Sequence, residues 1–144
     1  MCYNRIMAKF VWTEEYSVGI PSIDEQHRHF FDIANRVVEL AEKEDIGREE
    51  LTTSLGELGN YAFYHFSTEE GYFSKFNYEG AAIHISAHNN YRRQMEDYLG
   101  RVREENDLKS LAVVVANFSG NWLLGHILEM DKKYTVFFKE SGII

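Results

Sequence analysis

The sequence predicts an all-α protein: an up-down-up-down four-helix bundle with an N-terminal arm and a short C-terminal helix. Apolar residues recur every three or four positions in four long stretches, which is the spacing of one helix face. The single proline, Pro21, precedes all four stretches and interrupts none of them. No segment alternates between apolar and polar residues as a strand does. Short connections between the four stretches predict antiparallel neighbours.

The first helix should begin just after Pro21. Residues 1–20 show no sustained helical pattern, and their aromatic residues predict an arm packed across the bundle. Met7 is a second candidate for the natural start, which would make residues 1–6 an extension. Ser22 and Glu25 have the spacing of a capping box, so we expect the helix to run from Ser22 to about Lys43.

The other helices follow from turn residues between the periodic stretches. We expect a turn at 45–47, a second helix over 48–76, a break at 77–80 and a third helix over 81–105. Asn106 and Asp107 predict the next turn and cap, with a fourth helix from Leu108 and a terminal helical piece over 132–140. A chain of 144 residues buries one core, so we expect a single domain over 1–144, with an arm at 1–20 and the bundle at 22–138.

Composition and charge narrow the possible partners and location. A net charge of −8 argues against binding to nucleic acid or to an anionic membrane. The longest strongly apolar run, residues 111–116, is far shorter than the roughly 20 residues that cross a bilayer, so we expect no membrane insertion. Cys2 is the only cysteine, and the N-terminus has no signal-peptide pattern. We therefore expect a cytoplasmic protein, and we assign Cys2 no role.

Five of the six histidines fall on the apolar faces of the predicted helices, together with a glutamate and an aspartate. A lone core histidine is most often a structural residue, but five on four helices indicate a metal site, because buried imidazoles and carboxylates are costly unless something binds them. His29 lies about 200° around the helix from His27 and should be exposed. The candidate ligands are His27, His65, Glu69, His84, His88, His126 and Asp131.

The spacing of these residues allows two pairs of side chains to converge, whereas a third pair would not converge on an ideal helix. Helix positions four apart differ by about 40° and one turn, so His65 can converge with Glu69, and His84 with His88. His126 and Asp131 are five apart, or about 140° on an ideal helix. Their convergence requires a local distortion, such as a π-bulge or a helix end near residue 129.

The type and number of ligands favour a pair of metal ions. Nitrogen and oxygen ligands without a thiolate suit iron, manganese or zinc, and this set is too large for one ion. Two octahedral ions that share the carboxylates and an oxide or hydroxide would keep one vacant position, where a diatomic molecule could bind. Zinc-protease chemistry is disfavoured because Ile85 stands where the H-E-x-x-H motif requires glutamate. A ferritin-like di-iron site is disfavoured because no histidine has glutamate three residues before it.

Nearly the whole chain after Met7 resembles the hemerythrin family, and within it the single-domain bacterial members. The chain departs from the family at Tyr78-Glu79, where Tyr-Pro is common, and at Ala87, where glutamate is common. These departures leave the ligands untouched but put the nearby turn in question. The resemblance rests on Trp12, Tyr16-Ser17-Val18-Gly19-Ile20, Ile23-Asp24, Gln26-His27, His65-Phe66-x-x-Glu69-Glu70, His84-x-x-x-His88 and Trp122-x-x-x-His126-Ile127-x-x-x-Asp131-x-x-Tyr134.

The resemblance implies a non-heme site with two irons and an oxo or hydroxo bridge. It implies His27 and His65 on one iron, His84, His88 and His126 on the other, and Glu69 and Asp131 bridging both. It also implies reversible binding of dioxygen at the iron with two histidines, inside a dry pocket. Our candidates for the lining of that pocket are Phe66, Trp122 and Leu123.

The sequence shows no positioned general base and no substrate cleft, so we expect a binding protein and not an enzyme. Two alternatives stay open: a di-iron redox enzyme acting on peroxide or nitric oxide, and an iron-storage or metal-stabilised structural bundle. We expect a monomer whose partner is dioxygen, with an oxygen-consuming enzyme or a redox protein as a candidate further partner. Whether oxygen binding serves transport, storage, delivery or sensing is open at this stage.

Overall fold

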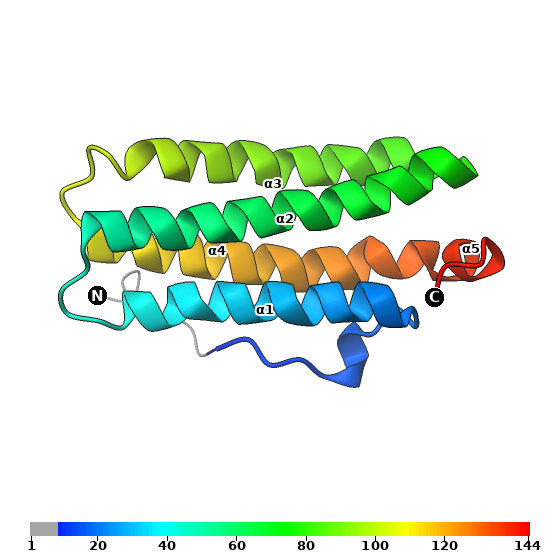
Figure 1. The fold of residues 1–144 in the computed structure, drawn as a ribbon, viewed down its shortest axis with the longest axis horizontal. Coiled ribbons are helices and arrows are strands. Elements are labelled where there is room, and N and C mark those ends of the chain that lie inside the picture. The colour runs from blue at the N-terminus through cyan, green and yellow to red at the C-terminus, as the bar shows by residue number, and fades with distance from the viewer. Residues whose placement is uncertain (1–8) are drawn as a thin grey trace.

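The computed structural model describes residues 9–144, so the candidate start at Met7 and the residue Cys2 lie outside the described residues. Four long helices lie side by side and alternate in direction (Figure 1). No strand occurs within residues 9–144. The predicted all-α, up-down-up-down bundle is confirmed. Its elements are η2 (Glu14–Tyr16), α1 (Pro21–Ala41), α2 (Arg48–Phe76), α3 (Ala81–Arg101), α4 (Leu108–Glu129), η3 (Asp131–Tyr134) and α5 (Thr135–Glu140).

The core of the bundle changes character along its length. The first half of α2 buries Leu51, Leu55 and Leu58, whereas its second half buries His65 and Glu69 together with Phe66 and Phe73. Fully burying an aliphatic side chain stabilises a fold by about 1.5–3 kcal/mol. The apolar side chains buried along the bundle therefore offset the cost of burying the charged and polar groups.

The start of α1 corrects one prediction. Ser22 and Glu25 do not form a capping box: the helix begins at Pro21 after an extended Ile20, and no side chain caps it. Proline suits the first helical position because it lacks the amide hydrogen that would otherwise need a partner. Within the described chain the Ser22 hydroxyl is buried without a hydrogen-bond partner. Asp24 instead fixes the incoming chain by accepting hydrogen bonds from the Ser17 hydroxyl and from the Val18 amide at 2.8 Å.

The other boundaries largely agree with the sequence. The predicted span of α2 is confirmed, and Asn77 ends it in the left-handed region, with φ of 57°. The prediction of Asp107 as the cap of α4 is confirmed, because its carboxylate accepts from the Ser110 amide at 3.0 Å. The first and third helices end early, at residues 41 and 101 instead of 43 and 105.

The described part of the arm runs along the outside of α1 (Figure 1). The Asn35 side chain bonds both the amide and the carbonyl of Phe10 at 2.8 Å, which holds this extended segment in place. The Phe10 ring fills the space over Gly120, where a Cβ atom would come within 1.7 Å of it. The rings of Trp12 and Tyr16 each lie 5.6 Å from the ring of Phe31.

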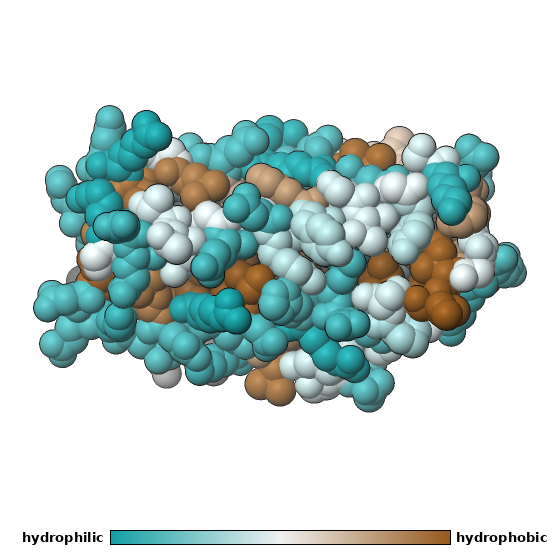
Figure 2. All heavy atoms as spheres, viewed as in Figure 1, coloured by the Kyte–Doolittle hydropathy of each residue, from teal (hydrophilic) through white to brown (hydrophobic). Residues whose placement is uncertain are grey.

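Within residues 9–144, one segment, Leu108–Glu140, is long and apolar enough to match a membrane span by composition, and its most apolar 18-residue window has a mean hydropathy of 1.4. More than half of its most apolar window is buried inside the bundle (56%). The segment also changes from α4 to η3 after Met130. The apolar part of this segment is therefore a helix of the bundle core, α4. The face of the molecule in Figure 2 is mostly hydrophilic, with hydrophobic atoms in scattered groups.

Candidate metal centre

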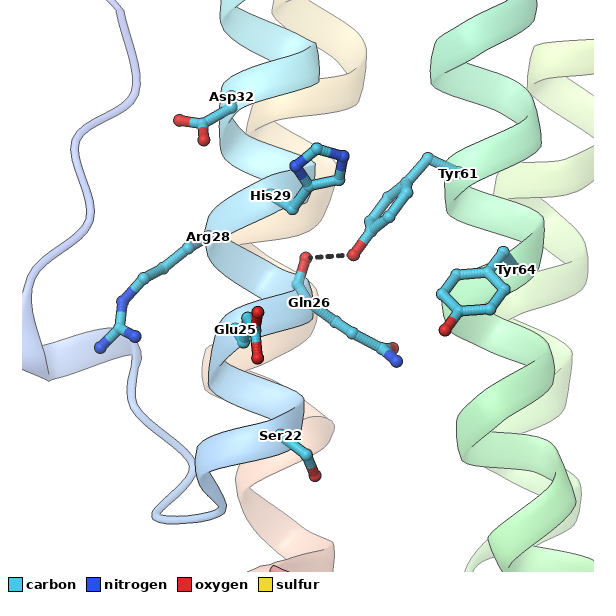
Figure 3. Close-up of a pocket in the computed structure, with 8 residues that line it drawn as sticks. All are labelled: Ser22, Glu25, Gln26, Arg28, His29, Asp32, Tyr61 and Tyr64. Carbon is cyan, nitrogen blue, oxygen red and sulfur yellow. Dashed lines mark hydrogen bonds between the residues drawn. The ribbon is translucent and has the colours of Figure 1, made fainter.

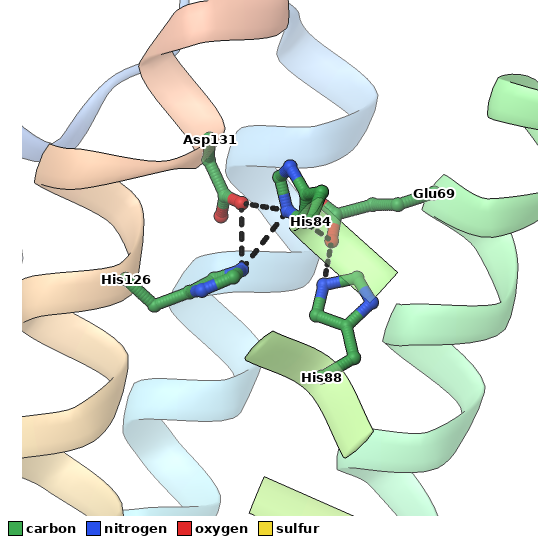
Figure 4. A group of neighbouring side chains, drawn as sticks. All are labelled: Glu69, His84, His88, His126 and Asp131. Atoms are coloured by element: carbon green, nitrogen blue, oxygen red, sulfur yellow. Dashed lines mark hydrogen bonds and ion pairs between the residues drawn. The ribbon is translucent and has the colours of Figure 1, made fainter. Parts of the chain in front are cut away.

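All seven predicted ligand residues meet in the polar half of the core. α1 supplies one histidine, α2 a histidine and the glutamate, α3 two histidines, α4 one histidine, and η3 the aspartate. Figure 4 shows five of these side chains converging from different elements. His126 is the most exposed of the seven at 6%, and the other six are at most 1% exposed.

The ligand atoms fall into two groups that overlap. Within each group, one nitrogen or oxygen atom from every residue lies within 4.8 Å of all the others. Both groups contain the same two carboxylates, so each carboxylate faces histidines of both groups. The smaller group is His27, His65, Glu69 and Asp131, and the larger group is Glu69, His84, His88, His126 and Asp131.

Asp131 connects the two groups through its two oxygen atoms. Its Oδ2 lies 3.0 Å from Nε2 of His27 in the smaller group. Its Oδ1 lies 2.9 Å from Nε2 of His84 and 3.0 Å from Nε2 of His126, both in the larger group. The expected distortion is confirmed as a helix end: α4 stops at Glu129, and the tighter turn of η3 brings Asp131 back toward His126.

Glu69 connects the groups in a different way. Its Oε1 lies 3.5 Å from Nε2 of His65 in the smaller group and 3.1 Å from Nε2 of His88 in the larger one. Its Oε2 accepts a hydrogen bond from the hydroxyl of Tyr134. One oxygen of Glu69 thus faces both sets of imidazoles, while the other is held by η3.

The buried polar atoms of this cluster fit a bound cation. Within residues 9–144, several buried atoms of these histidine–carboxylate pairs have no hydrogen-bond partner: Nε2 of His27, His65 and His88, Oε1 of Glu69 and both carboxylate oxygens of Asp131. Unpartnered buried acceptors and charges are costly, and a cation placed among them would satisfy them all.

The protonation states of His65 and Asp131 suit the same cation. Burial lowers the pKa of His65 to about 4, so its imidazole is neutral near pH 7. Burial by itself would raise the pKa of Asp131, but His126, His27 and His84 hold it well below the usual range. A neutral imidazole and an ionised carboxylate are ligands that iron and zinc accept. At His126, burial lowers the pKa, but the neighbouring Asp131 carboxylate outweighs burial and raises this pKa above its usual value.

A second layer of residues, to which the sequence pattern assigned no role, holds the imidazole rings. Nδ1 of His65 lies 2.7 Å from Oε1 of Gln26, and Nδ1 of His88 lies 2.7 Å from Oε2 of Glu70. Arg92 bonds the same Glu70 oxygen at 2.9 Å. Such contacts fix the orientation of a metal-binding ring. In the sequence, the position of Arg92 four residues after His88 is the pattern that could have indicated its place in this second layer.

Two of the three residues expected to line the oxygen pocket, Phe66 and Trp122, contact histidines of the cluster. The Phe66 ring stacks on His88 at 4.1 Å and lies 6.0 Å from His65. The Trp122 ring stacks on His126 at 4.4 Å. Leu123 is buried. Phe66 therefore contacts both groups, whereas Trp122 shields the larger one.

His29 is exposed, as the helix rotation predicts. It borders a hollow of about 570 Å³ between α1 and α2, where its ring lies 4.6 Å from the ring of Tyr61 (Figure 3). None of the seven candidate ligands lines this hollow. Gln26 does line it, and it joins the hollow to the site through its contact with His65.

The fold and the cluster together define a class: a helical bundle built around a buried metal site of histidines and carboxylates. The family model described as "Hemerythrin HHE cation binding domain" matches residues 18–136, and the chain belongs to this family. With this site and this family, it is an oxygen-binding, non-heme iron protein.

Similar proteins support the assignment over most of the chain. A bacteriohemerythrin of Clostridium acetobutylicum is 32% identical over 128 residues, covering 87% of this chain and 98% of that protein. Hemerythrin subunit 2 of Golfingia vulgaris is 26% identical and covers 87% of this chain and 90% of that protein. A solved structure, a wild-type hemerythrin, superposes with a TM-score of 0.78 at 27% identity, covering 90% of this chain and 97% of that one.

Proposed function

We propose that this protein binds dioxygen reversibly at two irons held by the seven clustered residues. His27 and His65 would hold one iron, and His84, His88 and His126 would hold the other. Glu69 and Asp131 would bridge the two. The observation that carries this proposal is that two ligand groups share both carboxylates, as a bridged pair of ions requires.

Ferrous iron, when bound, supplies the electrons and the vacant coordination position that dioxygen needs. The chain supplies a dry, rigid surrounding. Phe66 and Trp122 cover imidazole faces and limit the access of water there, which would protect a bound diatomic molecule from loss through outside protons. Burial holds the pKa of Tyr134 well above 10, so its hydroxyl stays protonated and donates to Glu69 near pH 7.

We further propose that the protein is a binder without catalytic turnover. The second layer of Gln26, Glu70 and Arg92 is already engaged with the histidines and with each other, so none of these groups is positioned as a free general acid or base. We also propose a single-domain monomer in the cytoplasm, with an oxygen-consuming enzyme or a redox protein as its further partner.

The test compares a buried histidine, His65, with an exposed one, His29. His65→Ala removes a ligand from the smaller group, so we expect loss of one iron and of the oxygen-dependent visible absorption. His29→Ala should retain both irons and change stability by no more than about 0.5 kcal/mol, as surface substitutions do. Metal analysis and visible spectra with and without oxygen measure both effects.

Three results would overturn the proposal. The first is a wild-type protein that holds fewer than two irons per chain after full loading. The second is a silent His65→Ala variant. The third is sustained turnover of peroxide or nitric oxide with a reductant, combined with no stable oxygenated spectrum, which would favour the redox enzyme.

A further inference from the structure

A hollow of about 350 Å³ lies between α3 and the end of α4, directly beside the larger ligand group. Trp122, His126 and Met130 line it from the α4 side, and Ala87 lines it from α3. His126 is also the most exposed of the seven candidate ligands. Among the candidate ligands, His126 is therefore the one least covered by other residues.

Two small residues make this hollow. A Cβ atom built on Gly125 would meet no atom within 4 Å, so the space in front of α4 is open there. Ala87 faces the same space from α3 with only a methyl group, at the position where the resemblance led us to expect glutamate more often. A larger side chain at either position would fill the hollow.

Beside the hollow, the chain changes from α4 to η3 between two of the candidate ligands. α4 ends at Glu129, and His126 and Asp131 lie on either side of that end. Helix ends open locally at a lower free-energy cost than helix centres. A small movement at Met130 would loosen both ligands together, whereas the other five lie within continuous helices.

The mouth of the hollow carries a negative charge. The exposed carboxylate of Glu129 lines it, next to the imidazole of His126. A carboxylate beside a surface hollow raises the local concentration of cations there. A carboxylate and an imidazole together form a transient first binding pair for a divalent metal ion.

We propose that this hollow is the route by which ferrous ion enters and leaves the site, with Glu129 and His126 as its first contacts. The inference rests on the proposed function, because it takes His126 as an iron ligand. It adds the route, the first binding pair and the two small residues that keep the route open.

The test measures the rate of iron exchange instead of oxygen binding. The wild-type protein and Gly125→Leu are loaded with ferrous ion, and iron release to a coloured ferrous chelator is followed under anaerobic conditions. We expect Gly125→Leu to slow release at least tenfold with the iron content unchanged. Gly100→Leu is the matched control, because Gly100 also has open space around its Cβ but lies away from the site on α3; its release rate should equal that of the wild type.

Two further variants keep the proposal testable if leucine at 125 disturbs the neighbouring ligand. Ala87→Leu closes the hollow from α3 and should also slow release. Glu129→Gln should slow ferrous uptake by the apo protein severalfold at low salt, whereas Glu49→Gln, at the far end of α2, should not.

The outcomes separate the route from the site itself. Unchanged release in both Gly125→Leu and Ala87→Leu, with two irons per chain, would overturn the route and leave the proposed function standing. A wild-type protein that holds no iron would overturn the proposed function. Slower release in Gly100→Leu as well would show that the effect is not specific to the hollow, and would also overturn the route.

Discussion

Tyr134 donates a hydrogen bond from its hydroxyl to Oε2 of Glu69, although the two residues are 65 positions apart. Both side chains are fully buried. The bond ties η3, which carries Asp131, to α2, which carries Glu69. The hydroxyl of Tyr134 therefore helps to fix the positions of the two shared carboxylates relative to each other.

Tyr134→Phe should weaken both the fold and the site. The change leaves Oε2 of Glu69 buried without its donor, and the unmet acceptor should lower the free energy of unfolding by about 1–3 kcal/mol. Denaturant unfolding and iron content measure the effect. Tyr91→Phe is the control, because it breaks a buried bond of 2.7 Å to Ser119 and touches neither carboxylate. Equal loss of iron in both variants would contradict the role of Tyr134.

Asp131→Asn should remove iron from both ligand groups. The amide has neither the charge nor the second equivalent oxygen that faces His27, so we expect less than one iron per chain by metal analysis. Asp24→Asn provides the comparison, because Asp24 is also a buried carboxylate but bonds the incoming chain near Val18. It should lower stability and retain its iron. Full iron content in Asp131→Asn would rule out the bridging position.

Removing the metal should destabilise the protein strongly. In the apo protein, buried atoms of His27, Glu69 and Asp131 have no hydrogen-bond partner within the described chain. A ligand at a thousandfold excess over its Kd stabilises the fold by about 4 kcal/mol. Thermal melts of the holo and apo protein should therefore differ by on the order of 10 °C. Coincident melting curves would mean that no ion is bound among these groups.

Gly120→Ala should release the N-terminal arm without damaging the site. A methyl group at 120 would overlap the Phe10 ring, and the ring can leave because it lies on an arm and not on a bundle helix. We expect faster proteolysis near Phe10 with unchanged iron content. Gly56→Ala, with open space around its Cβ, should instead stabilise α2 by about 0.5–1 kcal/mol. Protection of the arm in Gly120→Ala would contradict its docking over this glycine.

Helix rotation predicted which face each candidate ligand occupies. It separated buried His27 from exposed His29, and it paired His65 with Glu69 on one side of α2. These positions are local, because 3.6 residues per turn fix the direction of a side chain once the segment is helical. The apolar periodicity and the short connections predicted the bundle for the same reason.

The sequence failed where the outcome depended on the surroundings. The capping box at Ser22 is consistent with local rules, but Pro21 begins the helix and Asp24 fixes the incoming chain. The early ends of the first and third helices likewise depend on how each terminal turn packs. The local sequence pattern does not show which of several allowed helix caps and helix ends will form.

The sequence by itself determined four helices, their order and the seven polar side chains that they place in one core. Only the tertiary structure decided that both oxygens of Asp131 face different histidines, that Tyr134 holds Glu69, and that the site is least covered at His126. The physical reason is that these relationships join residues far apart in the chain. They depend on the closing of α4 into η3 and on the packing of α3 against α4, which no local spacing fixes.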